Sequence, residues 1–164
     1  MKNLYLFRHG QTNENAAGKR YGLASGGWLT DQGIQQASEL AQKLADAQID
    51  VFFASPYQRS VHTAMIVAQK HQEAIILTDY RLREGVFFWW DNQSEDNINE
   101  AKETLARVKS ALDDILKTDY ENIAIATHGG ITRAIMALLG FKIEGIENTK
   151  CFHVRGDGTS WELV

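Results

Sequence analysis

The sequence is poor in cysteine and proline and has no long apolar run, and each shortage excludes a class of protein. Cys151 is the only cysteine in 164 residues, so no internal disulfide framework can form, and we expect a cytoplasmic location. No apolar run is long enough to span a membrane, and the first five residues lead into a predicted strand rather than a signal peptide. Repeats, low-complexity tracts and Pro/Ser-rich linkers are also absent, which predicts one domain over residues 1–164.

An excess of basic residues is absent as well. The 17 Lys and Arg against 21 Asp and Glu give a formal net charge of -4, which argues against a general nucleic-acid binder. That charge still leaves room for one local basic pocket. We therefore expect no nucleic-acid partner. A membrane partner is not expected either, and the chain is expected to be a monomer or homodimer.

Short apolar runs alternate with helical patterns, which predicts an α/β fold with a mainly parallel sheet covered on both faces, a three-layer α/β/α sandwich. The predicted strands are residues 3–8, 50–54, 74–78 and 122–127. The first predicted helix begins after Thr30 and has apolar positions at Ile34, Ala37, Leu40, Ala41 and Leu44. The second begins at Ser55-Pro56 and runs to about His71. Two more helices are predicted over residues 98–117 and 130–139. Residues 13–28 are predicted to be a loop. The runs 150–155 and 159–164, joined by Gly156-Asp157-Gly158, predict a hairpin that forms an antiparallel edge.

Two phrases place a histidine and a glycine where an apolar, strand-like run stops. Arg8-His9-Gly10 follows the first run, and Thr127-His128-Gly129 follows a later one. Glycine permits a tight turn and a close approach of the backbone to a ligand. Ligands of open α/β sheets bind at the carboxyl ends of the strands. The two phrases therefore predict an anion site at one edge of the sheet.

Two more phrases follow predicted strands, one containing Arg59 and one containing Glu84. In a parallel sheet all four phrases meet at one edge, which brings together two arginines, two histidines and one carboxyl group. Guanidinium groups hold a phosphoryl group with paired hydrogen bonds, and free N–H groups at the helix start at Gly129 would add to them. A neutral histidine can attack phosphorus, and a carboxylic acid can protonate the leaving oxygen. The combination favours phosphoryl chemistry.

The same phrases resemble the motifs of a known family. Arg8-His9-Gly10-Gln11-Thr12, followed by Asn15, resembles the signature of the histidine phosphatase superfamily, the phosphoglycerate-mutase-like proteins. Further similar motifs follow in order: residues 29–33 with Gln36-Ala37, Ser55-Pro56 with Arg59 and Thr63-Ala64, Leu82-Arg83-Glu84, residues 127–130, and Asn148 with the final hairpin. The resemblance covers nearly the whole chain.

The resemblance implies a role for each residue of the site. His9 would be the nucleophile that forms a phosphohistidine, and Glu84 would protonate the leaving group and then act as the base for water. The phosphoryl group would be held by Arg8, Arg59 and His128. Further phosphate contacts would come from Thr12, Asn15 and Gly129. No metal or other cofactor is implied, because the arginines supply the positive charge that a magnesium ion would otherwise provide.

Two features depart from the family pattern. Members of this branch often carry glycines after the acid, where this sequence has Phe88 and Asn92, so the family pattern does not predict the shape of the pocket mouth here. The stretch between Glu84 and His128 is also short, whereas the cofactor-dependent mutases carry a long insertion there that covers the substrate. The short stretch favours hydrolysis: a metal-independent, acid-type phosphatase acting on a small phosphorylated metabolite. Specificity is assigned to residues 20–27 and 86–97.

Other interpretations stay open at this point. The chain could be a phosphohistidine protein phosphatase, because a short chain leaves the site open, or a phosphoglycerate-mutase-type phosphotransferase, or a non-catalytic binder of a phosphorylated ligand. Glu84 could pair with Arg81 and Arg83 on a loop. Trp89 and Trp90 could be packing residues or an apolar wall for the organic half of the substrate. Packing or surface roles are the expectation for Cys151 and for His62, His71 and His153.

Overall fold

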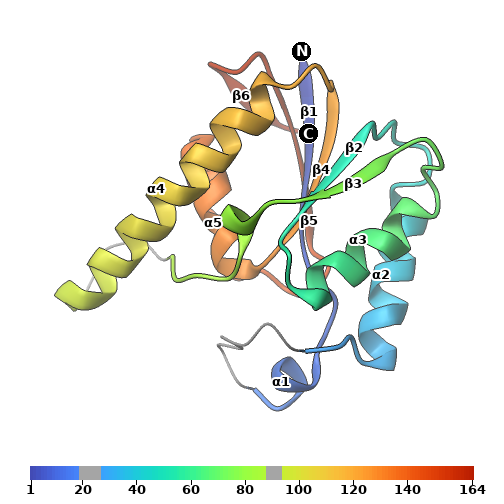
Figure 1. Cartoon of the computed structure of the whole chain (residues 1–164), viewed down its shortest axis with the longest axis horizontal. Helices are drawn as coiled ribbons and strands as arrows, with labels where there is room; N and C mark the ends of the chain where they lie inside the picture. Colours follow the sequence, from blue (N-terminus) through green and yellow to red (C-terminus); the bar gives the residue numbers. More distant parts are fainter. Residues whose placement is uncertain (19–26, 88–93) are drawn as a thin grey trace.

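A computed structural model describes residues 1–18, 27–87 and 94–164 and shows a six-stranded sheet between two helical layers (Figure 1). The strands are β1 (Lys2–Arg8), β2 (Val51–Ala54), β3 (Ile75–Thr78), β4 (Asn122–Thr127), β5 (Cys151–Gly156) and β6 (Trp161–Leu163). The helices are α1 (Asn13–Ala16), α2 (Asp31–Lys43), α3 (Gln58–Ala68), α4 (Glu95–Lys117) and α5 (Gly129–Leu138), with a short 3-10 helix η1 (Tyr80–Leu82).

The strands lie in the order β3-β2-β4-β1-β5-β6. Strands β1 to β4 are parallel, whereas β5 runs antiparallel to β1, and β6 antiparallel to β5. The register aligns the carboxyl ends of the parallel strands, with Arg8 paired to Thr127 and Ala54 paired to Thr78. The predicted fold class and the antiparallel hairpin at the edge are confirmed.

The strands β1, β2 and β4 are largely buried and apolar on both faces, and each face is covered by its own pair of helices. Leu4 and Leu6 of β1 belong to the core formed with α4 and α5, whereas Tyr5 and Phe7 belong to the core formed with α2 and α3. Figure 1 shows α4 and α5 on one side of the sheet and α2 and α3 on the other. A fully buried large apolar side chain contributes roughly 1.5–3 kcal/mol, so these two cores hold the strand ends in place.

The turn after β1 packs directly on the start of α2. A Cβ on Gly10 would collide with the carbonyl oxygen of Gly33, and a Cβ on Gly33 would collide with the carbonyl of Gln11. The N–H of Gly10 donates to Thr63 Oγ1 at 3.0 Å, and the carbonyl of Gln11 accepts from the N–H of Thr30 at 2.9 Å. Glycine is therefore required here by close backbone contact, which fixes the position of the neighbouring His9.

The structure corrects the prediction of a loop over residues 13–28, because α1 lies within it. Thr12 is the N-cap of α1: its hydroxyl accepts from the N–H of Asn15, while the side-chain oxygen of Asn15 accepts from the N–H of Thr12. This reciprocal pair satisfies donors that a short helix would otherwise leave open. The signal was present as a capping residue followed three positions later by an amide side chain.

Two helix starts and one helix face also differ from the predictions. Helix α3 begins at Gln58 rather than at Ser55-Pro56, because the Ser55 hydroxyl instead accepts from the N–H of Tyr57 in the turn after β2. It ends at Ala68, before His71. Helix α4 begins at Glu95 rather than at residue 98, because Ser94 caps it. Ile34, expected on the inner face of α2, is 39% exposed. None of the described helices is both long enough and apolar enough to cross a membrane.

Candidate active site

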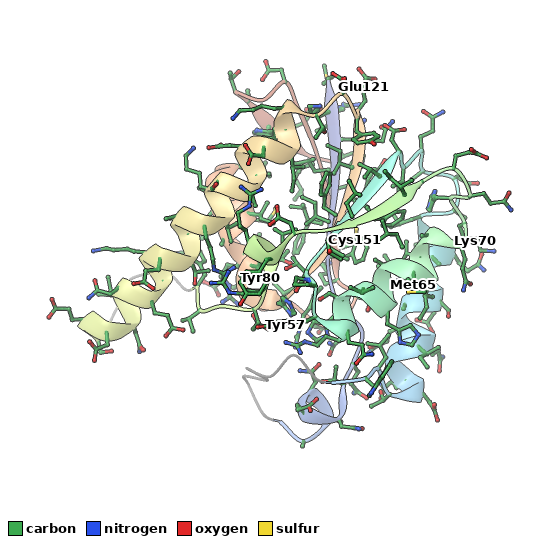
Figure 2. The ribbon with its side chains drawn as sticks, viewed as in Figure 1. Tyr57, Met65, Lys70, Tyr80, Glu121 and Cys151 are labelled. Atoms are coloured by element: carbon green, nitrogen blue, oxygen red, sulfur yellow. The ribbon has the colours of Figure 1, made fainter. Side chains whose placement is uncertain are left out.

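The residues that follow β1, β2, β3 and β4 meet at the carboxyl edge of the sheet, as predicted. In Figure 2, Tyr57 lies just beyond β2 at this edge, and Glu121, which precedes β4, lies at the opposite end of the sheet. A small pocket at the carboxyl edge is lined by Arg8, His9, Thr12, Glu14, Asn15, Arg59 and Glu84. His128 adjoins it, with its ring centroid 5.3 Å from that of His9.

The imidazole of His9 is held neutral with one nitrogen available. Nδ1 lies 2.7 Å from the carbonyl oxygen of Gly10, and since a carbonyl only accepts, Nδ1 carries the hydrogen and Nε2 keeps its lone pair. The side chain is 2% exposed. Burial, the largest cause, acts together with the positive charges of Arg8 and Arg59 to lower the pKa of His9 to about 3, although the hydrogen bond to Gly10 opposes them. A neutral imidazole with a free Nε2 is the form that can attack phosphorus.

Two guanidinium groups line the pocket. Arg8 is the last residue of β1, and its Nη1 donates to the carbonyl of Ile146 at 2.7 Å. Arg59, in the first turn of α3, is 4% exposed, and its Cζ lies 5.1 Å from the centre of the Tyr57 ring. Burial lowers the pKa of each arginine, and the carboxylate of Glu84 opposes the effect in both cases. Buried guanidinium groups that face a pocket are suited to holding an anion.

The carboxyl group of Glu84 lies between Arg59 and the second histidine. Its Oε2 lies 3.9 Å from Arg59 Nη2 and 3.4 Å from His128 Nδ1. Burial raises the pKa of Glu84, although its hydrogen bond from the N–H of Gly85 and the neighbouring arginines pull the pKa down. Because burial outweighs these effects, Glu84 keeps its proton to higher pH than a free glutamic acid and can act as a general acid.

His128 is fully buried and is oriented from behind. Its Nε2 lies 2.7 Å from the hydroxyl of Ser55, the first residue after β2, and its ring centroid lies 5.4 Å from that of Tyr57. Burial lowers the pKa of His128 well below its ordinary value, and the neighbouring His9 and the positively charged arginines act in the same direction. Ser55 thus contacts His128 from the turn before α3 and is not the first residue of that helix.

The start of α5 lies beside Arg8. A Cβ on Gly129 would lie 3.7 Å from Arg8 Cδ, so the first turn of α5, whose N–H groups have no acceptor within the helix, lies next to a residue that lines the pocket. A Cβ on Gly130 would collide with the carbonyl of Gly85, the residue after the acid. This backbone contact sets the distance between the acid segment and the second histidine motif.

Thr12 and Asn15 line the pocket and also hold its wall. Besides capping α1, Asn15 accepts at its side-chain oxygen from Asn148 Nδ2 at 3.2 Å. Asn148 Nδ2 also donates to the carbonyl of His9 at 2.9 Å. The segment containing α1 is thereby tied to the nucleophile candidate and to the loop before β5.

The structure contradicts the alternative in which Glu84 pairs with Arg81 and Arg83. Arg81 forms ion pairs with Asp79 and Asp114, each at 2.7 Å, and Arg83 places its guanidinium 4.4 Å from the centre of the Tyr80 ring. Within the part of the chain that the structure describes, the ion pair of Glu84 is instead with Arg59, which comes from α3.

The remaining residues singled out in the sequence lie away from the pocket or outside the described residues. Cys151 is partly buried against the core beneath α2 and α3, as expected for a packing residue. The ring of His71 packs near Phe52, and the residue is 8% exposed, so His71 is buried and does not lie on the surface. His62 faces Trp28, and His153 stacks on Tyr5. Outside the described residues lie Phe88, Trp89, Trp90, Asn92 and residues 20–26, which belong to a segment assigned to specificity.

By distance alone, His9, Glu84 and His128 could also hold a metal ion, since each offers a ligand atom within 4.8 Å of the other two. Two imidazoles and a carboxylate are a donor set that zinc accepts. Arg8 and Arg59 line the same pocket, however, and two fixed positive charges repel a further cation and attract an anion. The pocket therefore suits a phosphoryl group better than a metal.

Sequence reasoning missed Arg107, which holds the acid segment from α4. Its guanidinium donates to three backbone carbonyls of that segment, those of Arg81, Arg83 and Glu84. Gly85 packs so closely on this guanidinium that a Cβ there would collide with it. The only signal was a charged residue next to Val108 on the buried face of a predicted helix.

We expect Arg107→Gln to lower kcat by roughly 10- to 100-fold, because the carboxyl group of Glu84 loses its fixed position. Arg107→Lys should recover only part of the activity, since an ammonium cannot reproduce the planar fork. Arg83→Gln is the matched control, because that side chain lies on the same segment but faces Tyr80. Steady-state kinetics on an alkyl phosphate, with thermal unfolding as a check on folding, measure the effect. Equal activity in Arg107→Gln and Arg83→Gln would contradict the role of Arg107.

Comparison with known proteins points to the same family that the sequence motifs resemble. The profile of the histidine phosphatase superfamily (branch 1) matches residues 4–105 and 86–164. The chain is 31% identical over 172 residues to "Putative phosphoserine phosphatase 2" of Hydrogenobacter thermophilus, covering 90% of this chain and 84% of that protein. It is 27% identical over 188 residues to "Phosphoserine phosphatase 1" of the same organism, covering 100% and 86%.

The fold is also found among solved structures. Phosphoglycerate mutase from Bacillus anthracis superposes with a TM-score of 0.82 at 19% identity, over 99% of this chain and 91% of that one. This likeness concerns the fold, whereas the match to the family profile spans nearly all of the sequence. The chain belongs to the histidine phosphatase superfamily, branch 1.

Proposed function

We propose that this protein is a phosphatase that hydrolyses a small phosphorylated metabolite through a phosphohistidine on His9, without a metal ion. The observation that carries the proposal is the state of His9. Its imidazole is neutral, its Nδ1 is hydrogen-bonded to the carbonyl of Gly10, and its Nε2 keeps the lone pair needed for attack in a pocket that two guanidinium groups also line. The phosphoserine phosphatases among its relatives support a small phosphomonoester as substrate.

In the first step, the lone pair of His9 Nε2 forms a bond to phosphorus as the bond from phosphorus to the ester oxygen breaks. Arg8, Arg59 and the N–H groups at the start of α5 stabilise the charge on the phosphoryl oxygens, and His128 adds a further contact. The proton of Glu84 goes to the leaving oxygen, which departs as an alcohol. The raised pKa of Glu84 supports this role, because it keeps the acid protonated to higher pH.

In the second step, the Glu84 carboxylate takes a proton from a water molecule, whose oxygen attacks the phosphohistidine. The phosphorus–nitrogen bond breaks, and its electron pair returns to Nε2. Inorganic phosphate leaves, and both His9 and Glu84 are restored to their starting protonation states. Glu84 thus gives up a proton in the first step and regains one in the second, and the cycle consumes only the phosphate ester and water.

The protein should release phosphate from a small aryl phosphate in the presence of a chelator such as EDTA. The charge on the phosphoryl group is balanced by Arg8 and Arg59, so removal of divalent metals should leave kcat and KM unchanged. Phosphate release is measured with and without EDTA, and then with added magnesium or zinc. A folded protein that releases no phosphate, or that requires an added metal, would contradict the proposal.

A further inference from the structure

An arginine on α5 lies against the segment that carries the general acid. Arg133 Nη1 donates to the carbonyl of Phe87 at 2.8 Å, three residues along the chain from Glu84. One helical turn earlier on the same face of α5, Gly130 packs so closely on the carbonyl of Gly85 that a Cβ there would collide with it. This face of α5 therefore lies along the backbone that follows Glu84.

The guanidinium of Arg133 keeps one edge for a further acceptor. The hydrogen bond to Phe87 uses Nη1, whereas Nε and Nη2 form another edge of the planar group. Arg133 is half-buried, and across the described residues no ion pair involves it. Arg107 differs, because its terminal nitrogens donate to three backbone carbonyls of the same segment. Two parallel N–H groups on one edge match the two oxygens of a carboxylate.

The charge of Arg133 extends the positive field of the pocket. Burial is the largest cause that lowers the pKa of Arg8, and the positive charge of Arg133 acts in the same direction. The two guanidinium groups are thus close enough to repel each other, although only Arg8 lines the small pocket. A ligand that carries negative charge near both groups removes this repulsion.

The position of Arg133 matches the side from which the organic half of the substrate leaves. In the proposed reaction, Glu84 protonates the ester oxygen, and the organic half is attached to that oxygen. The organic half therefore extends along the segment that follows Glu84, and Arg133 contacts this segment at Phe87. Arg8 lines the part of the pocket that holds the phosphoryl oxygens.

Building on the proposed function, we propose that Arg133 binds a carboxylate on the organic half of the substrate and so selects phosphomonoesters of small hydroxycarboxylic acids over uncharged esters. The carboxylate accepts from Nε and Nη2 of Arg133, while Nη1 keeps its hydrogen bond to Phe87. An uncharged ester of the same size leaves this edge to water. Arg133 is a specificity residue and takes no part in the chemical steps.

A matched pair of substrates tests this assignment: 2-carboxyethyl phosphate and propyl phosphate, which differ only by a carboxylate in place of a terminal methyl. The wild-type protein should prefer the carboxyethyl ester in kcat/KM by about tenfold or more. Arg133→Gln should remove most of this preference, because glutamine can still donate to the carbonyl of Phe87 but carries no charge. Arg155→Gln removes the same charge from β5, where Arg155 pairs with Glu162, and should preserve the preference.

Binding to the His9→Ala variant separates this inference from the catalytic proposal, because titration calorimetry with the two esters needs no turnover. In that background the carboxyethyl ester should bind about tenfold or more tightly than the propyl ester, and adding Arg133→Gln should make the two affinities nearly equal. If Arg133 only holds the acid segment, Arg133→Gln weakens both esters alike and leaves their ratio unchanged, and that result overturns the inference. If the enzyme makes no phosphohistidine but the ratio depends on Arg133, the catalytic proposal fails and the role of Arg133 stands.

Discussion

Replacing His9 with alanine should lower kcat by on the order of 10⁴-fold or more, as is typical when a covalent nucleophile is removed. Binding of inorganic phosphate should persist, because Arg8, Arg59 and the start of α5 still hold the anion. The reason for the loss is specific: His9 lines the pocket with a neutral imidazole whose Nε2 keeps its lone pair while its Nδ1 is hydrogen-bonded to the carbonyl of Gly10. Phosphate release from an aryl phosphate and calorimetric titration of phosphate measure the two properties separately.

The control for this variant is His62→Ala, which removes an imidazole from α3 three residues after Arg59. His62 faces Trp28, so its loss should leave kcat close to that of the wild type. Wild-type turnover in His9→Ala would show that another group attacks the phosphorus. Loss of phosphate binding together with loss of activity would show that His9 mainly holds the anion.

Glu84→Gln should lower kcat/KM for alkyl phosphates by about 10²- to 10⁴-fold, the range expected for loss of a general acid. Glutamine keeps the size of the side chain and its position beside Arg59 and His128 but has no proton to give. An activated aryl ester should lose much less in its first step, because its oxygen leaves without a proton. The ratio of alkyl to aryl activity is the measurement. Equal losses for the two esters would contradict the role of Glu84 as acid.

The pH profile gives a second test of Glu84, and its direction follows from the two pKa shifts. The first step needs Glu84 protonated and His9 neutral. Activity should therefore fall as pH rises through the raised pKa of Glu84, and fall again on the acid side as His9 takes a proton near pH 3. Glu84→Gln should remove the basic limb that belongs to the enzyme and keep any inflection from ionisation of the substrate. A basic limb that is unchanged in the variant assigns it to another group.

The sequence predicted the convergence of the site because the sheet is parallel. Apolar runs marked the four strands, and their aligned carboxyl ends bring the following segments together without any further information. His9, Arg59, Glu84 and His128 could each be found in this way, since each follows a strand directly or within a few residues.

The residues that the sequence did not reveal act across elements. Arg107 reaches from the middle of α4 to carbonyl groups of a loop more than 20 residues away, and helical periodicity describes only which face of α4 is buried. Glu14 falls within the predicted loop over residues 13–28, and its place in the pocket depends on the small capped helix α1. The Ser55-Pro56 pair resembled a helix start, but Ser55 instead orients His128. Contacts of this kind depend on tertiary packing.

The central claim is that a phosphoryl group passes through His9, and rapid quench with a ³²P-labelled aryl phosphate tests it most directly. The account predicts a transient protein-bound label that is labile in acid and stable in base, maps to the peptide containing His9 and is absent in His9→Ala. In Glu84→Gln the label should accumulate, because water is no longer activated to remove it. Turnover by the wild-type protein without any bound label at the earliest times, or a label on a residue other than His9, would contradict the account.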